Sequence, residues 1–340
     1  MKVLRLSLFP FSILYWIVTT CRNLLYDLGF FKSYSFSPAI IAIGNLSTGG
    51  TGKTPQTEYL IRLLYNRFNL ATLSRGYKRK SKGFVLADEN ANADILGDEP
   101  YQFASKFNTV SIVVDADRKN GIEQLIVLKN PQIILLDDAY QHRRVKAGFY
   151  ILLTAYGDLY SDDYILPTGN LRESRSGAKR ASVIVVTKCP PQLSMDEQQK
   201  IIGKLKPLPS QKIFFTSIAY DTAVYNGVTS LETSVIKLQE KVLVAGIAKP
   251  QPFFNFLSNP NDIIKSYPDH HDFTDGELSE LNELAKTKII VTTEKDYMRL
   301  NGKLPSDTLF YLPIKSRFIN DGDDFDSTII SYVEQYIAEN

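Results

Sequence analysis

The residues best suited to chemistry stand in a glycine-rich turn near the N-terminus. Residues 39–43 are typical of a short apolar strand, three glycines follow within residues 49–52, and Lys53 and Thr54 open a helical pattern. Glycines let backbone N–H groups point inward around an anion, and a helix N-terminus adds partial positive charge. The lysine would reach the β- and γ-phosphates of a nucleotide, and the threonine hydroxyl would coordinate Mg²⁺. We therefore predict a phosphate-binding loop made of Ser47, Thr48, Gly49, Gly50, Thr51, Gly52, Lys53 and Thr54.

A pair of aspartates follows a second apolar run and fits the same chemistry. Residues 133–136 are typical of a buried strand, and Asp137 and Asp138 come directly after it. The carboxyl ends of parallel strands meet at one edge of a sheet, which is where ligands bind. Asp137 is therefore expected to hold the Mg²⁺ shell. Acidic turns after strands are common, so this interpretation depends on the loop beside it.

The nucleotide is expected to be ATP, because the sequence lacks the motifs that read guanine. The loop departs from the pattern G-x-x-x-x-G-K-[S/T] in Ser47, which stands at the first glycine position and makes the loop a variant. A GTPase would have a glycine where Tyr140 follows the aspartates. It would also have an aspartate where Pro190 stands after a later strand.

Polar clusters at the ends of other predicted strands could serve a phosphate acceptor. A kinase needs a group that orients or deprotonates the acceptor hydroxyl, and cations that offset transferred charge. All three histidines, His142, His270 and His271, fall in such clusters. The basic run at residues 75–82 would by itself be a solvated surface, but beside a phosphate-transfer site it favours an anionic acceptor. The clusters are Ser74–Lys80, Gly97–Pro100, Asp117–Arg118, Asp138–His142, Leu171–Glu173 and Pro268–His271.

The composition excludes several classes of protein. The two cysteines, Cys21 and Cys189, lie far apart among 340 residues. They rule out a disulfide scaffold and a cysteine-based zinc site, and they favour a reducing compartment. The formal net charge of +2 gives no general attraction to nucleic acid, so no nucleic-acid partner is expected. No obligate protein partner is evident either.

Alternating strand and helix patterns must position these residues. From about residue 33, short β-branched runs alternate with helical patterns. They predict a P-loop NTPase-like α/β fold with a doubly wound, mainly parallel sheet. Prolines near residue 207 and a second set of runs predict a smaller α/β domain. We expect a membrane-associated helix at 1–32, a core domain at 33–208 and a smaller domain at 209–340, whose final helix could pack back on the core.

Residues 4–20 form an apolar run whose role the run itself leaves open. Arg5 and Pro10 interrupt it, and it is shorter than the roughly 20 apolar residues that span a bilayer. No small-residue cleavage site follows it. Aromatic residues beside basic ones suit the lipid headgroup boundary, while a helix packed on the protein core fits equally well. Because four cations flank the run, we predict that residues 1–30 form an amphipathic helix lying on a membrane.

Together these segments resemble the tetraacyldisaccharide 4′-kinase family, the lipid A 4′-kinases of Gram-negative bacteria. The matching segments include GNLSTGGTGKTP (44–55), LSRGY (73–77), GDEP (97–100), LLDDAYQH (135–142), PTGNLRE (167–173), YPDHHDF (267–273) and VTTEKDYMRL (291–300). The resemblance implies an enzyme that transfers the γ-phosphate of ATP, with Mg²⁺, to the 4′-hydroxyl of an acylated glucosamine disaccharide 1-phosphate. It also implies an N-terminal helix docked on the cytoplasmic face of the inner membrane.

The resemblance further implies roles for individual residues. Asp98 and His270 match the catalytic pair of the family, with His271 as the alternative histidine. The implied Mg²⁺ ligands are Thr54, Glu99, Asp137 and Glu173. Further nucleotide contacts are Asp138, Gln141 and His142. Implied substrate contacts are Arg75, Tyr77, Arg118 and Arg172.

Two other classes of function stay open at this stage. A membrane-associated P-loop ATPase switch of the partitioning type would act by nucleotide-dependent binding, but it needs a second signature lysine where Thr48 stands. A non-catalytic membrane adaptor with a vestigial nucleotide site would not need intact Lys53, Thr54 and Asp137.

Overall fold

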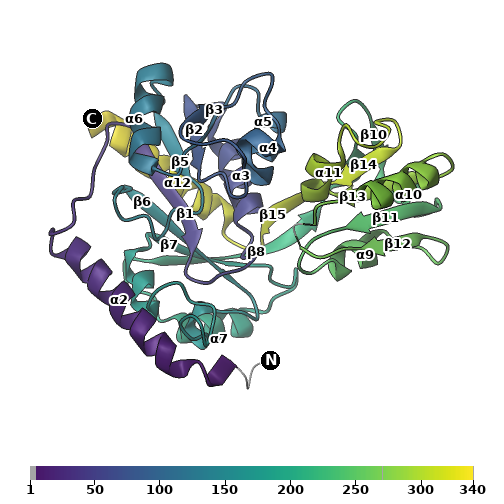
Figure 1. The fold of residues 1–340 in the computed structure, drawn as a ribbon. Coiled ribbons are helices and arrows are strands. Elements are labelled where there is room, and N and C mark those ends of the chain that lie inside the picture. Colours follow the sequence, from purple (N-terminus) through teal and green to yellow (C-terminus); the bar gives the residue numbers. More distant parts are fainter. Residues whose placement is uncertain (1–4, 270, 340) are drawn as a thin grey trace.

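Two α/β domains lie side by side in this computed structural model, which describes residues 5–269 and 271–339 (Figure 1). The strands of the larger domain are β1 (Ala39–Asn45), β2 (Leu70–Ser74), β3 (Val85–Leu86), β4 (Ser111–Val114), β5 (Ile133–Leu136), β6 (Phe149–Ala155), β7 (Val183–Thr187), β8 (Lys212–Tyr220) and β15 (Ile314–Phe318). They form one sheet in the order β15-β8-β7-β6-β1-β5-β2-β4-β3. The strands from β8 to β4 are parallel, and the edge strands β15 and β3 are antiparallel. The predicted doubly wound, mainly parallel sheet is confirmed.

Helices cover both faces of this sheet because a buried strand alternates its side chains between the two faces. The helices are α3 (Lys53–Leu64), α4 (Ala93–Leu96), α5 (Asp98–Lys106), α6 (Arg118–Lys129), α7 (Met195–Leu205) and α12 (Gly322–Glu339), with short 3₁₀ turns η1 (Tyr160–Asp162) and η2 (Arg175–Arg180). On one face, Ile41 of β1 packs in a core with Leu60 of α3 and Phe325 of α12. On the other face, Ile40 packs in a core with Ile122 of α6.

The parallel strands bring the predicted chemistry to one edge of the sheet. β5 lies between β1 and β2, and Leu136 at its end pairs in register with Ala42 of β1 and Leu73 of β2. The three strands therefore end at nearly the same level. The phosphate loop, Asp137 and the basic loop after β2 follow directly at this edge.

The smaller domain carries a sheet of its own. Its strands are β9 (Ala223–Tyr225), β10 (Ser230–Glu232), β11 (Lys241–Ala245), β12 (Ile263–Ser266), β13 (Ile289–Thr293) and β14 (Leu309–Leu312), in the order β10-β9-β14-β13-β11-β12. Its helices are α8 (Thr233–Ile236), α9 (Gln251–Leu257), α10 (Asp275–Ala285) and α11 (Glu294–Leu300). The predicted second α/β domain is therefore present.

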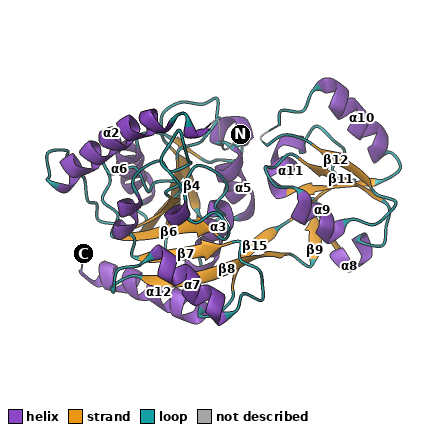
Figure 2. Cartoon of the chain, turned by 90° about the horizontal axis from the view of Figure 1, so that it is seen from below, coloured by secondary structure: helices purple, strands orange, loops and turns teal. Residues whose placement is uncertain are grey.

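The boundary expected at residue 209 is wrong. β8 pairs with β7 and β15 pairs with β8, so both strands belong to the larger sheet. The chain therefore enters the smaller domain after Tyr220 and returns before Ile314, and Figure 2 shows β8 and β15 between the two domains. α12 then packs on the larger core. The prolines near residue 207 mark a local break, whereas strand pairing is a long-range contact that the break does not reveal.

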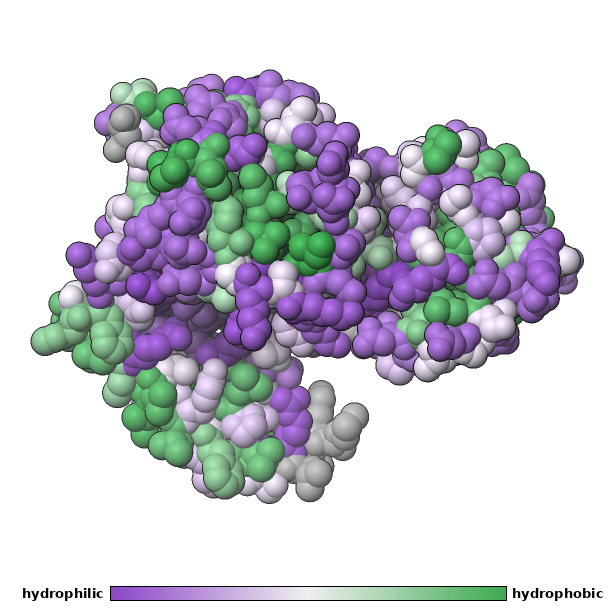
Figure 3. Space-filling view, turned by 45° about the horizontal axis from the view of Figure 1, so that its top comes forward, coloured by the Kyte–Doolittle hydropathy of each residue, from purple (hydrophilic) through white to green (hydrophobic). Residues whose placement is uncertain are grey.

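An N-terminal helix, α2 (Phe9–Asp27), runs along the outside of the larger domain (Figure 1). Its buried residues are the polar Ser12 and Thr19. Its exposed apolar residues are Phe9, Phe11, Ile13, Leu14, Trp16, Ile17, Val18 and Leu24. In Figure 3, apolar residues gather on the part of the molecule beside the grey N-terminal atoms. Within the described ranges, every helix falls short of the length and apolar character needed to cross a membrane.

Candidate active site

The phosphate loop joins β1 to α3 and is held from both sides. Gly52 precedes α3 with φ of +83°, in the left-handed region that favours glycine. The Thr187 hydroxyl at the end of β7 donates a hydrogen bond to the Thr51 carbonyl at 2.6 Å. On the other side, the Thr48 N–H donates to the Asn170 carbonyl at 2.7 Å. The loop therefore has a defined shape set by its two neighbouring segments.

Lys53 lies among polar groups at the carboxyl edge of the sheet. Its Nζ is 3.6 Å from Asp138 Oδ1 and 3.5 Å from Asn45 Oδ1. Arg172 donates to the same Asp138 oxygen at 2.9 Å and also to Asn45. Loss of hydration acts to raise the pKa of Asp138, but Lys53 and Arg172 outweigh it and lower that pKa. Two cations thus stand where the loop would present a triphosphate.

Asp137 lies buried after β5 and accepts a hydrogen bond from the Thr57 hydroxyl at 3.1 Å. Burial, followed by the charges of Glu99 and Asp138, raises the pKa of Asp137 to about 7. Crowded carboxylates favour a divalent cation, which removes their repulsion. Mg²⁺ at nucleotide sites takes one or two carboxylates together with phosphate oxygens and water. Asp137 and Glu99, with Thr54 at the start of α3, therefore fit this cofactor.

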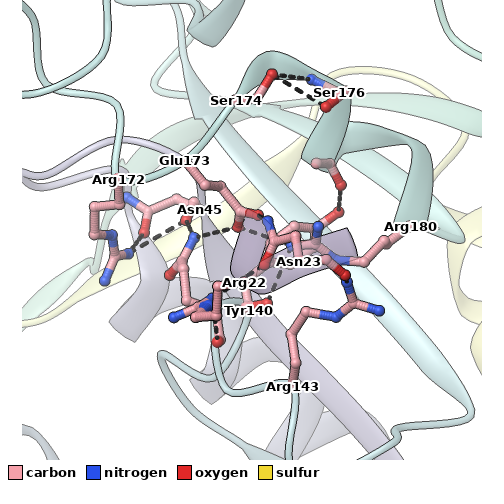
Figure 4. Close-up of polar contacts among 12 residues, drawn as sticks. Arg22, Asn23, Asn45, Tyr140, Arg143, Arg172, Glu173, Ser174, Ser176 and Arg180 are labelled. Carbon is pink, nitrogen blue, oxygen red and sulfur yellow. Dashed lines mark hydrogen bonds and ion pairs between the residues drawn. The ribbon is translucent and has the colours of Figure 1, made fainter. Parts of the chain in front are cut away.

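Glu173, which the resemblance implies as a metal ligand, is engaged by other side chains in this structure. It is fully buried, and its carboxylate accepts hydrogen bonds from Asn23 at 2.7 Å, Gln141 at 3.0 Å and Arg180 at 2.7 Å (Figure 4). Both oxygens are therefore engaged by side-chain donors. Gln141, which was expected to contact the nucleotide, also donates to the Asn45 carbonyl at 2.8 Å.

Arg118 and His142 lie beneath the same edge. Arg118 is 3% exposed and donates to the Asp115 carbonyl at 2.8 Å, and burial lowers its pKa to about 10. It therefore supports the loop after β4, and the substrate contact that the resemblance implies for Arg118 stays a prediction. Burial, followed by the charge of Arg118, lowers the pKa of His142 to about 4. His142 is thus neutral near pH 7 and can donate or accept a hydrogen bond at the predicted nucleotide site.

The basic loop after β2 presents two of the predicted substrate residues. Arg75 is exposed, and Tyr77 is 61% exposed. Arg79 folds back instead, donating to the Gly83 carbonyl at 2.6 Å and the Val114 carbonyl at 3.3 Å. Arg79 therefore shapes the loop, while Arg75 and Tyr77 point to the surface at the edge that carries the phosphate loop.

Asp98 faces the smaller domain. It is the first residue of α5, and its Oδ2 accepts hydrogen bonds from Nε (3.1 Å) and from a terminal nitrogen of Arg299 in α11. Asp296, which is fully buried, lies 3.7 Å from Arg299 and accepts a hydrogen bond from the Gly246 N–H at 2.8 Å. A Cβ at Gly246 would lie 3.3 Å from the Pro268 carbonyl. Asp296 thus contacts both Arg299 and the backbone of Gly246, and Gly246 lies next to the start of the histidine loop.

Of the two adjacent histidines, the predicted His270 lies outside the described residues. His271 is held in place by its surroundings. Its ring stacks on Tyr267 with centroids 4.8 Å apart, and its Nε2 lies 2.9 Å from a carboxylate oxygen of Glu277. Glu277 in turn caps the start of α10. This packing gives His271 a structural role in the loop.

Three residues of the site were missed from the sequence. Thr57 lies one turn after Thr54 on α3, which places it on the same helix face. Asn45 is the polar last residue of the apolar strand β1. Arg299 lies in the matching segment VTTEKDYMRL, but nothing in that segment indicated its partner, because its contact with Asp98 joins residues 201 positions apart.

The fold and the site together define a class of protein. A lysine-bearing phosphate loop after the first strand of a doubly wound parallel sheet, with paired aspartates at the same edge, is the arrangement of P-loop nucleotide-binding proteins. The sequence model of the family described as tetraacyldisaccharide-1-P 4′-kinase matches residues 4–334. The chain belongs to this family.

Individual relatives agree over nearly the full length. The tetraacyldisaccharide 4′-kinase of Flavobacterium johnsoniae is 59% identical over 336 residues, which cover 98% of this chain and 99% of that protein. The one from Bacteroides thetaiotaomicron is 42% identical, covering 96% and 93%. A crystal structure of LpxK from Aquifex aeolicus in complex with ATP is similar with a TM-score of 0.78 at 30% identity, covering 97% of this chain and 99% of that chain.

Proposed function

We propose that this chain transfers the γ-phosphate of ATP to the 4′-hydroxyl of a tetraacyldisaccharide 1-phosphate, a step of lipid A biosynthesis. The single observation that carries the proposal is the phosphate loop, with Lys53 beside Asp138 and Asp137 at one sheet edge, in a member of this kinase family. The relatives carry the name of this activity, and the similar crystal structure contains ATP.

The site residues divide between the two substrates. The loop amides and Lys53 bind the triphosphate, and Arg172 offsets charge on the transferred phosphoryl group. Asp137, Glu99 and Thr54 would hold Mg²⁺, which would neutralise charge on the phosphate oxygens. Asp98, which lies at the boundary between the domains, orients or deprotonates the acceptor hydroxyl, and His270 is its partner in this role. Arg75 and Tyr77 contact the anionic lipid substrate.

The chain acts at the cytoplasmic face of the inner membrane, with α2 lying on the lipid surface. Support comes from the side chains of α2, which reverse the usual pattern of a soluble helix. Phe11 and Leu14 are more than 60% exposed, while Ser12 faces the protein at 5%. Apolar side chains beside basic residues bind the headgroup boundary of a membrane. This location also gives access to an acylated substrate.

The test is to incubate the purified protein with Mg-ATP and the disaccharide 1-phosphate and to separate the lipids by thin-layer chromatography. A bisphosphorylated lipid is expected, and Lys53→Ala should lose most of it, because a contact to a transferring phosphoryl group typically contributes several kcal/mol. ATP hydrolysis without a phosphorylated lipid would instead favour the partitioning-type ATPase. Wild-type turnover in Lys53→Ala would refute the assigned nucleotide site.

A further inference from the structure

Helix α2 is attached to the larger domain through polar side chains, although most of its length is apolar. The face toward the domain carries Ser12, Tyr15, Thr19 and Asn23, spaced three or four residues apart as one helix face requires. Apolar burial therefore contributes little to the position of the helix. Its position on the protein depends on hydrogen bonds with particular partners.

Those partners belong to the segment that borders the phosphate loop. Ser12 Oγ donates to Thr168 Oγ1 at 2.7 Å, and the Tyr15 hydroxyl donates to the Arg172 carbonyl at 3.0 Å. The guanidinium of the same Arg172 donates to Asp138 beside the phosphate loop. A single residue, Arg172, therefore connects the helix to the nucleotide site.

A second connection passes through the buried carboxylate of Glu173 (Figure 4). It accepts hydrogen bonds from Asn23 of α2 at 2.7 Å and from Gln141 at 3.0 Å. The same Gln141 nitrogen donates to the carbonyl of Asn45, the residue that ends β1 just before the loop. Arg180 compensates the charge at 2.7 Å. A buried carboxylate is tolerated while its donors are present, but the loss of one donor is costly.

We propose that Glu173 is a positioning residue that couples the docking of α2 to the geometry of the phosphate loop. When α2 leaves its place, Asn23 leaves the buried carboxylate. The Glu173 carboxylate then turns toward its remaining donors, Gln141 and Arg180. Gln141 moves with it, and the Asn45 carbonyl loses the hydrogen bond from Gln141. Docking of α2 and binding of Mg-ATP are therefore linked, and each favours the other by the same factor. The inference rests on the proposed function for the identity of the nucleotide.

The coupling can be measured by calorimetry as the affinity of the full-length protein for Mg-ATP in detergent, without lipid substrate. Asn23→Ala and Glu173→Gln should each raise the dissociation constant about tenfold. The double variant should be little worse than either single variant, because both break one connection. Cys21→Ser changes an exposed side chain of the same helix and should bind Mg-ATP like the wild type.

A second measurement needs no variant. Hydrogen exchange within residues 12–27 of the wild-type protein should slow when Mg-ATP is added, and Asn23→Ala should remove this response. The coupling is overturned if the hydrogen-exchange rate does not change when Mg-ATP is added. It is also overturned if both Asn23→Ala and Glu173→Gln bind Mg-ATP with the affinity of the wild type. The variant Lys53→Ala distinguishes a failure of the coupling from a failure of the proposed function. If Lys53→Ala alone loses Mg-ATP binding, the nucleotide site stands and the coupling is refuted.

Discussion

At the scale of single residues, the buried carboxyl group of Asp137 makes the stability of the protein depend on pH. Its pKa rises from the ordinary value of 3.8 to about 7, so the folded protein holds the proton more strongly than the unfolded chain. Its contribution therefore favours folding most below pH 3.8, declines as the pH rises, and is lost above pH 7. We expect Asp137→Asn to raise the melting temperature by a few degrees at pH 8 and to abolish kinase activity.

Thermal denaturation of wild type and Asp137→Asn at several pH values tests this expectation. The difference in melting temperature between the two proteins should be small at pH 4 and largest near pH 8. Mg²⁺ should reduce this difference by stabilising the wild type. A pH-independent gap, or a variant less stable than the wild type at pH 8, would contradict the assignment of Asp137 as a crowded carboxylate.

Arg299 is a second residue whose role can be tested. It joins the smaller domain to Asp98 and lies 3.7 Å from the buried Asp296. Arg299→Lys keeps the charge but loses the planar fork, so kcat should fall about tenfold, while the KM for ATP stays near the wild-type value. Lys303→Ala, an exposed change in the same domain, is the control and should leave both constants unchanged. A rise in the KM for ATP without a change in kcat would exclude a role at the acceptor.

At the scale of elements, three helices from both domains meet around one lysine. Lys106 of α5 lies 2.8 Å from Glu58 of α3 and also contacts Glu294 of α11, and all three side chains are largely buried. Burial raises the pKa of Glu294, while Lys106 opposes the shift. Lys106→Met leaves Glu294 buried beside a second carboxylate and should lower the free energy of unfolding by about 3 kcal/mol.

Urea denaturation can measure this loss against a matched change at the surface. Lys204 pairs with Asp162 where both side chains are half exposed. Lys204→Met should therefore change the free energy of unfolding by less than about 1 kcal/mol. Equal losses in the two variants would mean that the helix junction contributes no more than a surface ion pair.

At the scale of the whole molecule, the exposed apolar face of α2 gives the protein one side suited to a membrane. Phe11 and Leu14 are 63% and 62% exposed on that face. The double change Phe11→Glu/Leu14→Glu should reduce recovery with anionic vesicles about tenfold or more, because two charges replace apolar groups at the lipid boundary. Val127→Glu alters an apolar residue on α6 that is even more exposed, at 81%, and should not affect recovery. Equal recovery of both variants would refute the assigned face.

The sequence by itself determined the features that depend on neighbours along the chain. The phosphate loop, the aspartates after β5 and the alternation of strands and helices each occupy a short segment, where local backbone preferences and spacing suffice. Parallel strands then bring their ends to one edge, so the meeting of Lys53 and Asp138 could be expected before the structure was known.

Only the tertiary structure decided which distant groups pair. Glu173 was expected to bind metal, but it accepts a hydrogen bond from Asn23, 150 positions away. The periodicity of α2 could indicate two faces, but not that the polar face would turn inward. The return of β15 to the larger sheet was equally hidden. Such contacts depend on the packing of complete elements, since a buried polar group takes whichever partner the fold brings within hydrogen-bond distance.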